Sequence, residues 1–296
     1  MRRYGKTMQA FQVFVKYLLF RILENPLLLC YDIRYERYLT FIGRKDQIMT
    51  YQRLLSYTRK AVDDYQMIQE GDRIAVGVSG GKDSITLALA LKGLQRFYPH
   101  HFEVMAFTVS LGFPQFDTAP LEEFMRSYEI PYHVIPTDIG SIVFEELKES
   151  NPCSLCAKMR KGAFNDFALQ MHCNKVALGH HKEDVVETFF MSLFYEGRLH
   201  TFSPVTYWDR TGLYAIRPLL YTPEADIIAF TKNMNLPVIK NPCPADGVTK
   251  RGEFKERLRH WNTEIGHTTE RAFRAIQDSI PGWQVQKGNE HERKLS

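Results

Sequence analysis

The chain has 296 residues, of which 44% are hydrophobic and 24% are charged. That length is enough for one large or two modest domains with a proper core, and the composition excludes a disordered or fibrous protein. The formal net charge is +4, but residues 1–48 carry nine Lys or Arg against four Asp or Glu, which leaves the remainder at −1. Overall charge therefore does not indicate a nucleic-acid-binding protein, and only local patches can do so.

The first 48 residues carry no chemical motif. Residues 11–31 are apolar, but three charged residues and a proline interrupt them, whereas a membrane span needs about 20 mostly uncharged residues. No small-residue cleavage site follows, so a signal peptide is not expected. We interpret residues 1–48 as an extension upstream of a native start near Met49. The alternative is a basic amphipathic helix that touches a membrane or a partner.

Beyond this segment, short β-branched apolar runs alternate with amphipathic stretches. The predicted strands are residues 73–78, 102–109, 132–135, 175–178 and 213–216. The predicted helices are residues 51–67, 85–94, 119–128, 144–148, 157–171, 184–194, 224–233 and 251–264. This alternation is typical of an α/β fold with a doubly wound, five-stranded parallel sheet that binds its ligand at the carboxyl ends of the strands. We expect one domain over residues 49–281 and a polar tail over residues 282–296.

The first strand leads into a helix through residues 79–84, Ser-Gly-Gly-Lys-Asp-Ser, called the phosphate loop below. A helix N-terminus offers unpaired N–H groups and a positive dipole end, and both attract phosphate. A Walker A loop is excluded because only three residues separate Gly77 from Gly81 and because Asp83 follows Lys82. The loop resembles the PP-loop of the ATP pyrophosphatase superfamily. That resemblance implies a Rossmann-like fold of the adenine nucleotide hydrolase type and cleavage of ATP between its α and β phosphates.

The five cysteines are Cys30, Cys153, Cys156, Cys173 and Cys243. An odd number without a secretory signal argues against a disulfide framework and for a reducing cytoplasm. Cys153 and Cys156 form a CxxC at the entry to a predicted helix, and the tripeptide Asn-Pro-Cys found there recurs at Cys243. Three thiolates suit a 4Fe-4S cluster with one open iron, a zinc ion with a histidine as fourth ligand, or a redox-active thiol set. Cys173 borders a predicted strand and is interpreted as a small buried apolar residue.

Several motifs together resemble the TtcA family of tRNA 2-thiocytidine synthetases over about residues 49–261. They are the phosphate loop, the CxxC with a basic helix after it, residues 179–184 (Gly-His-His-Lys-Glu-Asp) followed by Glu187 and Thr188, residues 217–219 (Arg-Pro-Leu), and the late Cys243. The resemblance implies a tRNA sulfurtransferase that acts on cytidine at position 32 with ATP, Mg²⁺ and a 4Fe-4S cluster on Cys153, Cys156 and Cys243. Cys243 stands alone, whereas some relatives carry a second cysteine nearby, so the substrate of this branch can differ.

In the implied reaction ATP adenylates the C2 oxygen, sulfide attacks C2 and AMP departs, the open iron carrying the incoming sulfide. Lys82 would neutralise the pyrophosphate, while Asp83 with Asp184 would hold Mg²⁺, which makes these three the predicted catalytic residues. The predicted nucleotide-binding residues are Ser79, Gly80, Gly81, Lys82, Asp83, Ser84, His180 and His181. Each histidine can orient phosphate, shuttle a proton or serve the fold, and their separate roles stay open.

Basic residues beside the cysteine sites are candidates for contact with RNA. They are Lys158, Arg160, Lys161, Lys250 and Arg251, with Lys255, Arg257 and Arg259 further along the last predicted helix. Such runs also occur on any solvated helix face, but their position next to both cysteine sites favours tRNA. The other expected partners are a sulfur donor, either a cysteine desulfurase or sulfide, and a second copy of the chain, since the family suggests a homodimer.

Two other functions remain open from the sequence. Another PP-loop tRNA-modifying enzyme, such as a lysidine synthetase or a persulfide-relay thiolase, would need no iron. A nucleotide-binding iron–sulfur sensor would bind without turnover. Iron content separates the first of these from the cluster-dependent enzyme, and pyrophosphate release in the presence of tRNA would exclude the second.

Overall fold

The computed structural model describes residues 45–113, 115–147, 152–239 and 250–285. The chain divides into two units, residues 1–49 and residues 50–296, and the account below concerns the second. The interpretation of residues 1–48 as an extension falls almost entirely outside the described residues, as do Cys30 and Cys243. None of the described helices is long and apolar enough to cross a membrane.

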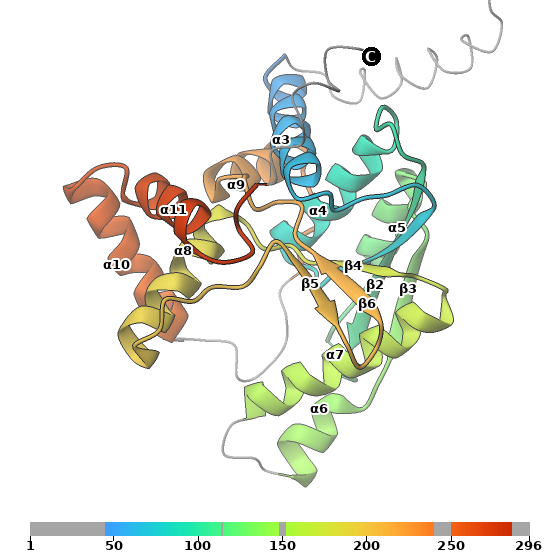
Figure 1. The fold of residues 1–296 in the computed structure, drawn as a ribbon. Coiled ribbons are helices and arrows are strands. Elements are labelled where there is room, and N and C mark those ends of the chain that lie inside the picture. Colours follow the sequence, from blue (N-terminus) through green and yellow to red (C-terminus); the bar gives the residue numbers. More distant parts are fainter. Residues whose placement is uncertain (1–44, 114, 148–151, 240–249, 286–296) are drawn as a thin grey trace, which may run out of the picture. The chain divides into compact units, whose positions relative to one another are not determined.

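A six-stranded sheet forms the centre of the fold, in the order β3-β2-β1-β4-β6-β5 (Figure 1). The strands are β1 (Asp72–Gly77), β2 (Phe102–Ser110), β3 (Tyr132–Pro136), β4 (Lys175–Ala177), β5 (Val205–Trp208) and β6 (Leu213–Ile216). β1 to β4 and β6 run parallel, whereas β5 pairs antiparallel with β6 at the edge. The predicted fold class is confirmed, and the structure adds β5 to the five predicted strands. The chain returns to the far side of β1 after β3, so the topological switch point lies between β1 and β4.

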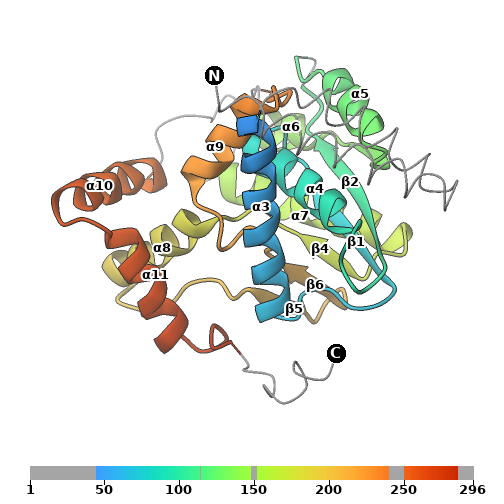
Figure 2. The ribbon, with the colours of Figure 1, turned by 90° about the horizontal axis from the view of Figure 1, so that it is seen from above.

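Helices cover both faces of this sheet. They are α3 (Lys45–Asp64), α4 (Lys82–Leu94), α5 (Ala119–Ser127), α6 (Ile139–Ser141), α7 (Pro152–Gln170), α8 (Lys182–Met191), α9 (Glu224–Asn233), α10 (Lys250–Glu264) and α11 (Thr268–Ser279). Two π-helical turns, η1 (Ile142–Glu146) and η2 (Ser192–Glu196), extend α6 and α8. α7 packs on one face, against β2 and β3, while α4 packs on the opposite face beside α9 (Figures 1 and 2).

The sequence of α4 explains its central place. Ten of its thirteen residues are buried, because small and apolar side chains occur on every side of the helix rather than on one stripe. β1 is similar, since Ile74, Ala75 and Val76 are all fully buried, as expected for a parallel strand covered on both faces. The strand and helix joined by the phosphate loop are therefore largely enclosed in the core, and they hold the loop in a fixed position.

One helix begins earlier than predicted, which changes the surroundings of two cysteines, and a further helix was not predicted. α7 begins at Pro152, five residues before the predicted start, because proline is well tolerated in the first turn of a helix. Cys153 and Cys156 are thus helical rather than part of a preceding turn. α11 was not predicted at all, although Thr269, Phe273 and Ile276 form its buried stripe.

The polar tail predicted from residue 282 begins too early. Trp283 is fully buried, and its ring meets those of Tyr65 and Phe273 edge-on, with centroids 5.9 and 5.6 Å away. Its Nε1–H donates a hydrogen bond of 3.1 Å to the carbonyl oxygen of Phe202. A large aromatic ring with a satisfied polar group is a core residue whatever the polarity of its neighbours. Residues 286–296 lie outside the described part of the chain.

We expect Trp283→Ala to lower the free energy of unfolding by about 3–5 kcal/mol, since it removes a fully buried aromatic side chain and leaves a cavity. Val285→Ala is the matched control, because Val285 is two residues away and 36% exposed; it should cost less than about 0.5 kcal/mol. Chemical denaturation of the purified variants measures both values. Equal losses in the two variants would mean that Trp283 is not part of the core.

Candidate functional site

The phosphate loop connects β1 to α4 at the topological switch point. Gly80 has φ +85°, a backbone conformation that glycine adopts without strain, and its carbonyl oxygen accepts a hydrogen bond of 2.9 Å from the Ile239 N–H. The Ser84 hydroxyl donates to the Gly81 carbonyl at 2.9 Å and accepts from the Ser79 N–H at 3.2 Å. Ser84 thus fixes the loop from inside, and the α4 N-cap residue Gly81 provides no side-chain hydrogen bond. N–H groups at this helix end remain available to an anion.

Lys82 lies between two carboxylates at the start of α4. Its Nζ is 2.8 Å from Asp83 Oδ1 and 3.1 Å from Glu224 Oε1. Burial alone would lower the pKa of the Lys82 amine, but the Asp83 hydrogen bond and charge, with those of Glu224, outweigh it and raise the pKa. The lysine is therefore a permanent cation beside the loop, as phosphate neutralisation requires.

Glu224, the first residue of α9, joins several elements around Lys82. Its Oε1 is 2.5 Å from Lys255 Nζ on α10, and its N–H donates to Glu183 Oε2 at 2.8 Å. Burial would raise the pKa of the Glu224 carboxyl, but the hydrogen bonds and charges of Lys255 and Lys82 bring it down to about 2. Sequence analysis missed this residue. Only its place after a proline, at a predicted helix start, marked it, and nothing local indicated that α9 begins beside the phosphate loop.

His181 and Asp184 lie together at the start of α8. The His181 N–H donates to Asp184 Oδ2 at 3.0 Å, and His181 Nδ1 is 3.1 Å from Glu183 Oε2. Burial would lower the pKa of the His181 imidazole, but Glu183, Asp184 and Asp83 together raise it. The ring is buried among three carboxylates, which it orients and partly neutralises.

His180 has a different environment from its neighbour. Its ring centroid lies 4.6 Å from that of Phe202, and it lines a cavity described below. Burial, assisted by the charge of Arg217, lowers the pKa of the His180 imidazole to about 4, so this ring is neutral at pH 7. The structure thus separates two histidines whose roles were left open by the sequence.

Glu187 and Arg251 form an ion pair next to Asp184. Arg251 Nη2 donates to Thr188 Oγ1 at 2.7 Å, and its Nε is 3.7 Å from Glu187 Oε2. Arg251, predicted to contact RNA, is therefore engaged with α8 in this structure. Burial raises the pKa of the Glu187 carboxyl to about 7, and the neighbouring Asp184 carboxylate adds to the effect.

A pH dependence of stability follows from Glu187. Because its pKa in the folded chain lies above its ordinary value of 4.5, the fold favours the protonated carboxyl, and stability is lost as pH rises from about 4.5 through 7. We expect Glu187→Gln to remove this loss. The free energy of unfolding of the variant, relative to that of the unaltered chain, should therefore increase by about 2 kcal/mol from pH 5 to pH 8. Denaturant unfolding at both pH values tests this, with the exposed Glu253→Gln as control. A stability difference that stays constant with pH would contradict it.

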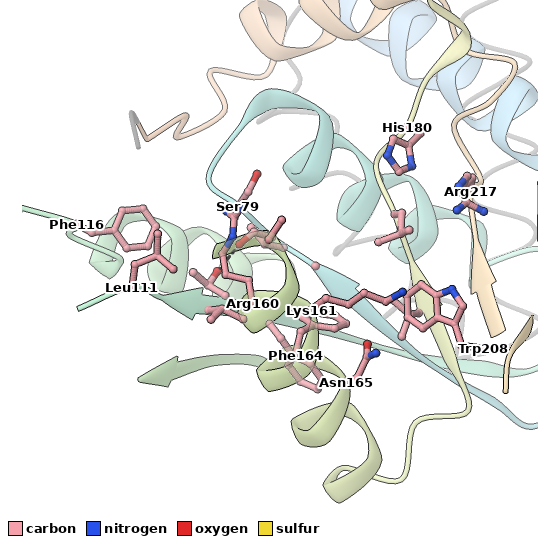
Figure 3. Close-up of a pocket in the computed structure, with 18 of the residues that line it drawn as sticks. Ser79, Leu111, Phe116, Arg160, Lys161, Phe164, Asn165, His180, Trp208 and Arg217 are labelled. Atoms are coloured by element: carbon pink, nitrogen blue, oxygen red, sulfur yellow. Dashed lines mark hydrogen bonds between the residues drawn. The ribbon is translucent and has the colours of Figure 1, made fainter. Parts of the chain in front are cut away.

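A cavity of about 640 Å³ opens beside the phosphate loop (Figure 3), within the size range of small-molecule sites. One wall comes from the ends of β1 and β2, including Val78, Ser79 and Leu111. Another comes from α7, β4, β5 and the residue that follows β6, Arg217. Arg160, Lys161 and Arg217 also line it, and none of its described lining residues is a carboxylate. The cavity therefore suits an electron-rich or anionic ligand.

Two of the predicted RNA-binding residues belong to this cavity wall. Arg160 and Lys161 both line it, and Lys161 Nζ lies 3.8 Å from the centroid of the Trp208 ring, a close cation–π contact. Lys158 is exposed, one turn earlier on α7. The side chain of Lys250 lies outside the described residues. The basic residues of α7, which form one run in the sequence, thus divide between the cavity and the solvent.

Cys153 and Cys156 occupy the first turns of α7, one exposed and one buried, and neither forms a disulfide. Their spacing places them on the same side of the helix, and Cys156 packs with Leu111, Ile139 and Val143. Two reduced thiols on one rigid helix fit a thiolate-bound metal centre whose further ligand comes from elsewhere in the chain. Among the described residues, no three His, Cys, Asp or Glu side chains gather as a metal site.

Cys173 is confirmed as an interior residue. It is 4% exposed and packs with Ala75 and Val176, and burial raises the pKa of its thiol to about 11. Such a thiol is neutral and inert at pH 7. It therefore makes a control for the other cysteines.

A family model for the PP-loop domain matches residues 51–260. A tRNA-cytidine(32) 2-sulfurtransferase from Stutzerimonas stutzeri is 39% identical over 232 residues, which cover 78% of this chain and 85% of that protein. The protein of the same name from Dichelobacter nodosus is 38% identical, with coverage of 78% and 87%. Among solved structures, the U34-tRNA thiolase NcsA from Methanococcus maripaludis with its [4Fe-4S] cluster matches with a TM-score of 0.65 and 22% identity. This match covers 78% of this chain and 79% of that one and indicates the same fold.

Proposed function

This chain belongs to the PP-loop family and, within it, to the tRNA-cytidine(32) 2-sulfurtransferases, and from this premise we propose that it replaces O2 of cytidine 32 in tRNA by sulfur at the cost of one ATP. The observation that supports this most is the phosphate loop with its cationic Lys82, which opens on a cavity lined by cations and no described carboxylate. The same site contains both a place for the triphosphate and room for a second, neutral reactant.

The reaction has two bond exchanges. The cytidine O2 attacks the α phosphorus of ATP, the bond from the α phosphorus to the bridging oxygen breaks, and pyrophosphate leaves with that electron pair. Sulfide then attacks C2 and AMP leaves with the original oxygen, so that C2=O becomes C2=S. Lys82 and the N–H groups of the loop stabilise the charge that develops on the pyrophosphate. The carboxylates of Asp83 and Asp184 would hold Mg²⁺, which would supply positive charge to the phosphates.

Glu224 and His181 keep these groups in position. Glu224 also contacts Lys82, with Nζ to Oε1 at 3.1 Å. His181 holds Asp184 through the 3.0 Å hydrogen bond of its backbone N–H and through its ring, whose Nε2 is 3.4 Å from Asp184 Oδ2. Both residues are buried. We assign them a positioning role, because each acts on ATP through a catalytic neighbour rather than by direct contact.

The thiols of Cys153, Cys156 and Cys243 would hold a 4Fe-4S cluster. With three protein ligands, such a cluster would keep one iron without a protein ligand and would supply sulfide there. The two described thiols fit this group, since both are reduced and share one side of α7. Cys156 packs in a small apolar group with Leu111, Ile139 and Val143.

The other expected participants belong to this proposal as well. Lys158, Arg160, Lys161, Lys250 and Arg251 are the candidate tRNA contacts. A cysteine desulfurase or sulfide supplies the sulfur, the chain acts as a homodimer in the cytoplasm, and the catalytic domain extends over residues 49–281. Recognition of an unpaired loop base, which can leave its stack and enter a pocket, is consistent with a target in the anticodon loop.

The test is to express the chain in cells whose tRNA lacks 2-thiocytidine and to analyse tRNA nucleosides by mass spectrometry. We expect 2-thiocytidine to appear at nucleotide 32, and an Asp184→Asn variant to restore none. A thiolated base other than cytidine, or lysidine, would identify a different PP-loop enzyme. Unmodified tRNA in cells that contain folded protein and a sulfur donor would contradict the proposal.

A further inference from the structure

Three polar atoms in the cavity wall are buried without a hydrogen-bond partner in the described part of the chain. They are Asn165 Oδ1, His180 Nδ1 and Arg217 Nε, and all three residues line the cavity. Asn165 is 5% exposed and Arg217 is 7% exposed. A buried polar group left unpaired is costly, so native structures satisfy nearly all of them. Three such atoms on one cavity indicate a polar ligand that completes their hydrogen bonds.

The side chains around these atoms form one region of the cavity, the inner chamber, made of Lys161, Phe164, Asn165, His180, Trp208 and Arg217 (Figure 3). Phe164, His180 and Trp208 each contribute an aromatic ring, which favours a flat ligand. Arg217 is held in place from behind, because its Nη1 donates to the Ser203 carbonyl at 2.6 Å and to Thr206 Oγ1 at 3.1 Å. Its Nε–H is thus a fixed donor, whereas Asn165 Oδ1 is an acceptor.

We propose that the inner chamber binds the target cytosine of the RNA, with Arg217 Nε–H donating to a ring acceptor and Asn165 Oδ1 accepting from the exocyclic amine. This inference rests on the proposed function. Cytosine has acceptors at O2 and N3 and a donor at N4, so it satisfies both side chains. Uracil has a carbonyl in place of the amine and sets two acceptors against each other at Asn165.

Adenine also has ring acceptors and an exocyclic amine, so the position of the phosphate loop, rather than hydrogen bonding, assigns the inner chamber to the pyrimidine. The other cavity wall, with Val78, Ser79 and Leu111 beside the phosphate loop, offers the nucleoside of ATP a mostly apolar surface. With ATP there and cytosine in the inner chamber, both reactants share one cavity, as attack of O2 on the α phosphorus requires.

The intrinsic fluorescence of Trp208 reports on the chamber in the unaltered protein. The probes are three anticodon stem–loop RNAs that differ only at nucleotide 32, with cytidine, uridine or an abasic ribose. We expect the cytidine RNA to change the Trp208 emission, and the abasic RNA to bind without changing it. ATP alone should leave the emission unaltered. The Trp208→Phe variant identifies the contribution of this ring among the three tryptophans of the chain.

A substitution then tests the hydrogen bond. Asn165→Leu should lower kcat/KM for tRNA about 10- to 100-fold while leaving the KM for ATP within about twofold, since one buried hydrogen bond is lost. It should also reduce the preference for cytidine over uridine. Asp166→Leu, at the exposed neighbouring position on α7, is the matched control.

Three results would overturn this inference: a Trp208 signal with ATP alone, an equal signal with the abasic RNA, or unchanged cytidine preference in Asn165→Leu. Each can occur while the unaltered enzyme still thiolates cytidine 32, in which case the proposed function stands. If the unaltered enzyme thiolates no cytidine at all, the proposed function fails instead. The fluorescence measurement uses the protein with Asn165 unaltered, so it still tests the inference if Asn165→Leu does not fold.

Discussion

Lys82→Ala is expected to lower the rate of AMP and pyrophosphate formation by about 10²–10³-fold, the cost of removing one preorganised electrostatic contact with a transition state. Lys82 is the cation at the start of α4, 2.8 Å from Asp83 and 3.1 Å from Glu224. Without it, these two carboxylates would face the charge on the departing pyrophosphate. The KM for ATP should also rise, because the lysine binds the ground-state phosphates as well.

The matched control is Lys92→Ala, at the other end of the same helix, where the amine donates to the Glu129 carbonyl. It should leave the rate unchanged within about twofold. Steady-state release of AMP from labelled ATP, in the presence of tRNA and sulfide, measures both variants. If Lys82→Ala retained near-normal turnover with the same thermal stability as Lys92→Ala, the phosphate loop would not be the site of ATP cleavage.

Cys243→Ala is expected to remove the iron from the protein. Anaerobically prepared enzyme should contain about four iron and four sulfide per chain and show the broad absorption of an iron–sulfur cluster. The variant should lose both, because two remaining thiolates on one helix do not enclose a cluster. Thiolation of tRNA should fall below detection, whereas ATP binding at the separate phosphate loop should persist.

Cys173→Ala is the control for this loss, since its thiol is buried in the sheet core and carries a raised pKa. It should keep its full iron content. Iron-free wild-type protein that still thiolates tRNA would contradict the cluster assignment and favour a persulfide relay. Stoichiometric zinc in place of iron would point to a structural metal on the same three cysteines.

The sequence was sufficient for features encoded by neighbouring residues. β1, the phosphate loop and α4 follow one another within a few turns, so apolar periodicity and glycine position predicted them together. The same kind of local pattern predicted α9 at its observed bounds, residues 224–233, and α10 to within one residue of its observed start. β5 was missed because a four-residue antiparallel edge strand carries little periodicity. α11 carried an amphipathic signal in Phe273 and Ile276 that was overlooked.

The arrangement around the site depended on contacts between distant parts of the chain. Glu224 reaches Lys82 and Lys255 only because the N-terminal parts of α4, α9 and α10 lie together, and no local pattern encodes such a meeting. The different surroundings of His180 and His181 arise in the same way, since one faces Phe202 and Arg217 while the other faces three carboxylates. Only the tertiary structure could therefore distinguish the environments of these two adjacent histidines.

The stoichiometry of a single reconstituted reaction tests the central claim most directly. Holoenzyme, ATP, sulfide and unmodified tRNA with cytidine 32 are combined, and AMP, pyrophosphate and 2-thiocytidine are quantified together. The proposed mechanism predicts one AMP and one pyrophosphate for every 2-thiocytidine, and none of the three when cytidine 32 is replaced by uridine. AMP formed without thiolated tRNA, or ADP formed in place of AMP, would contradict it.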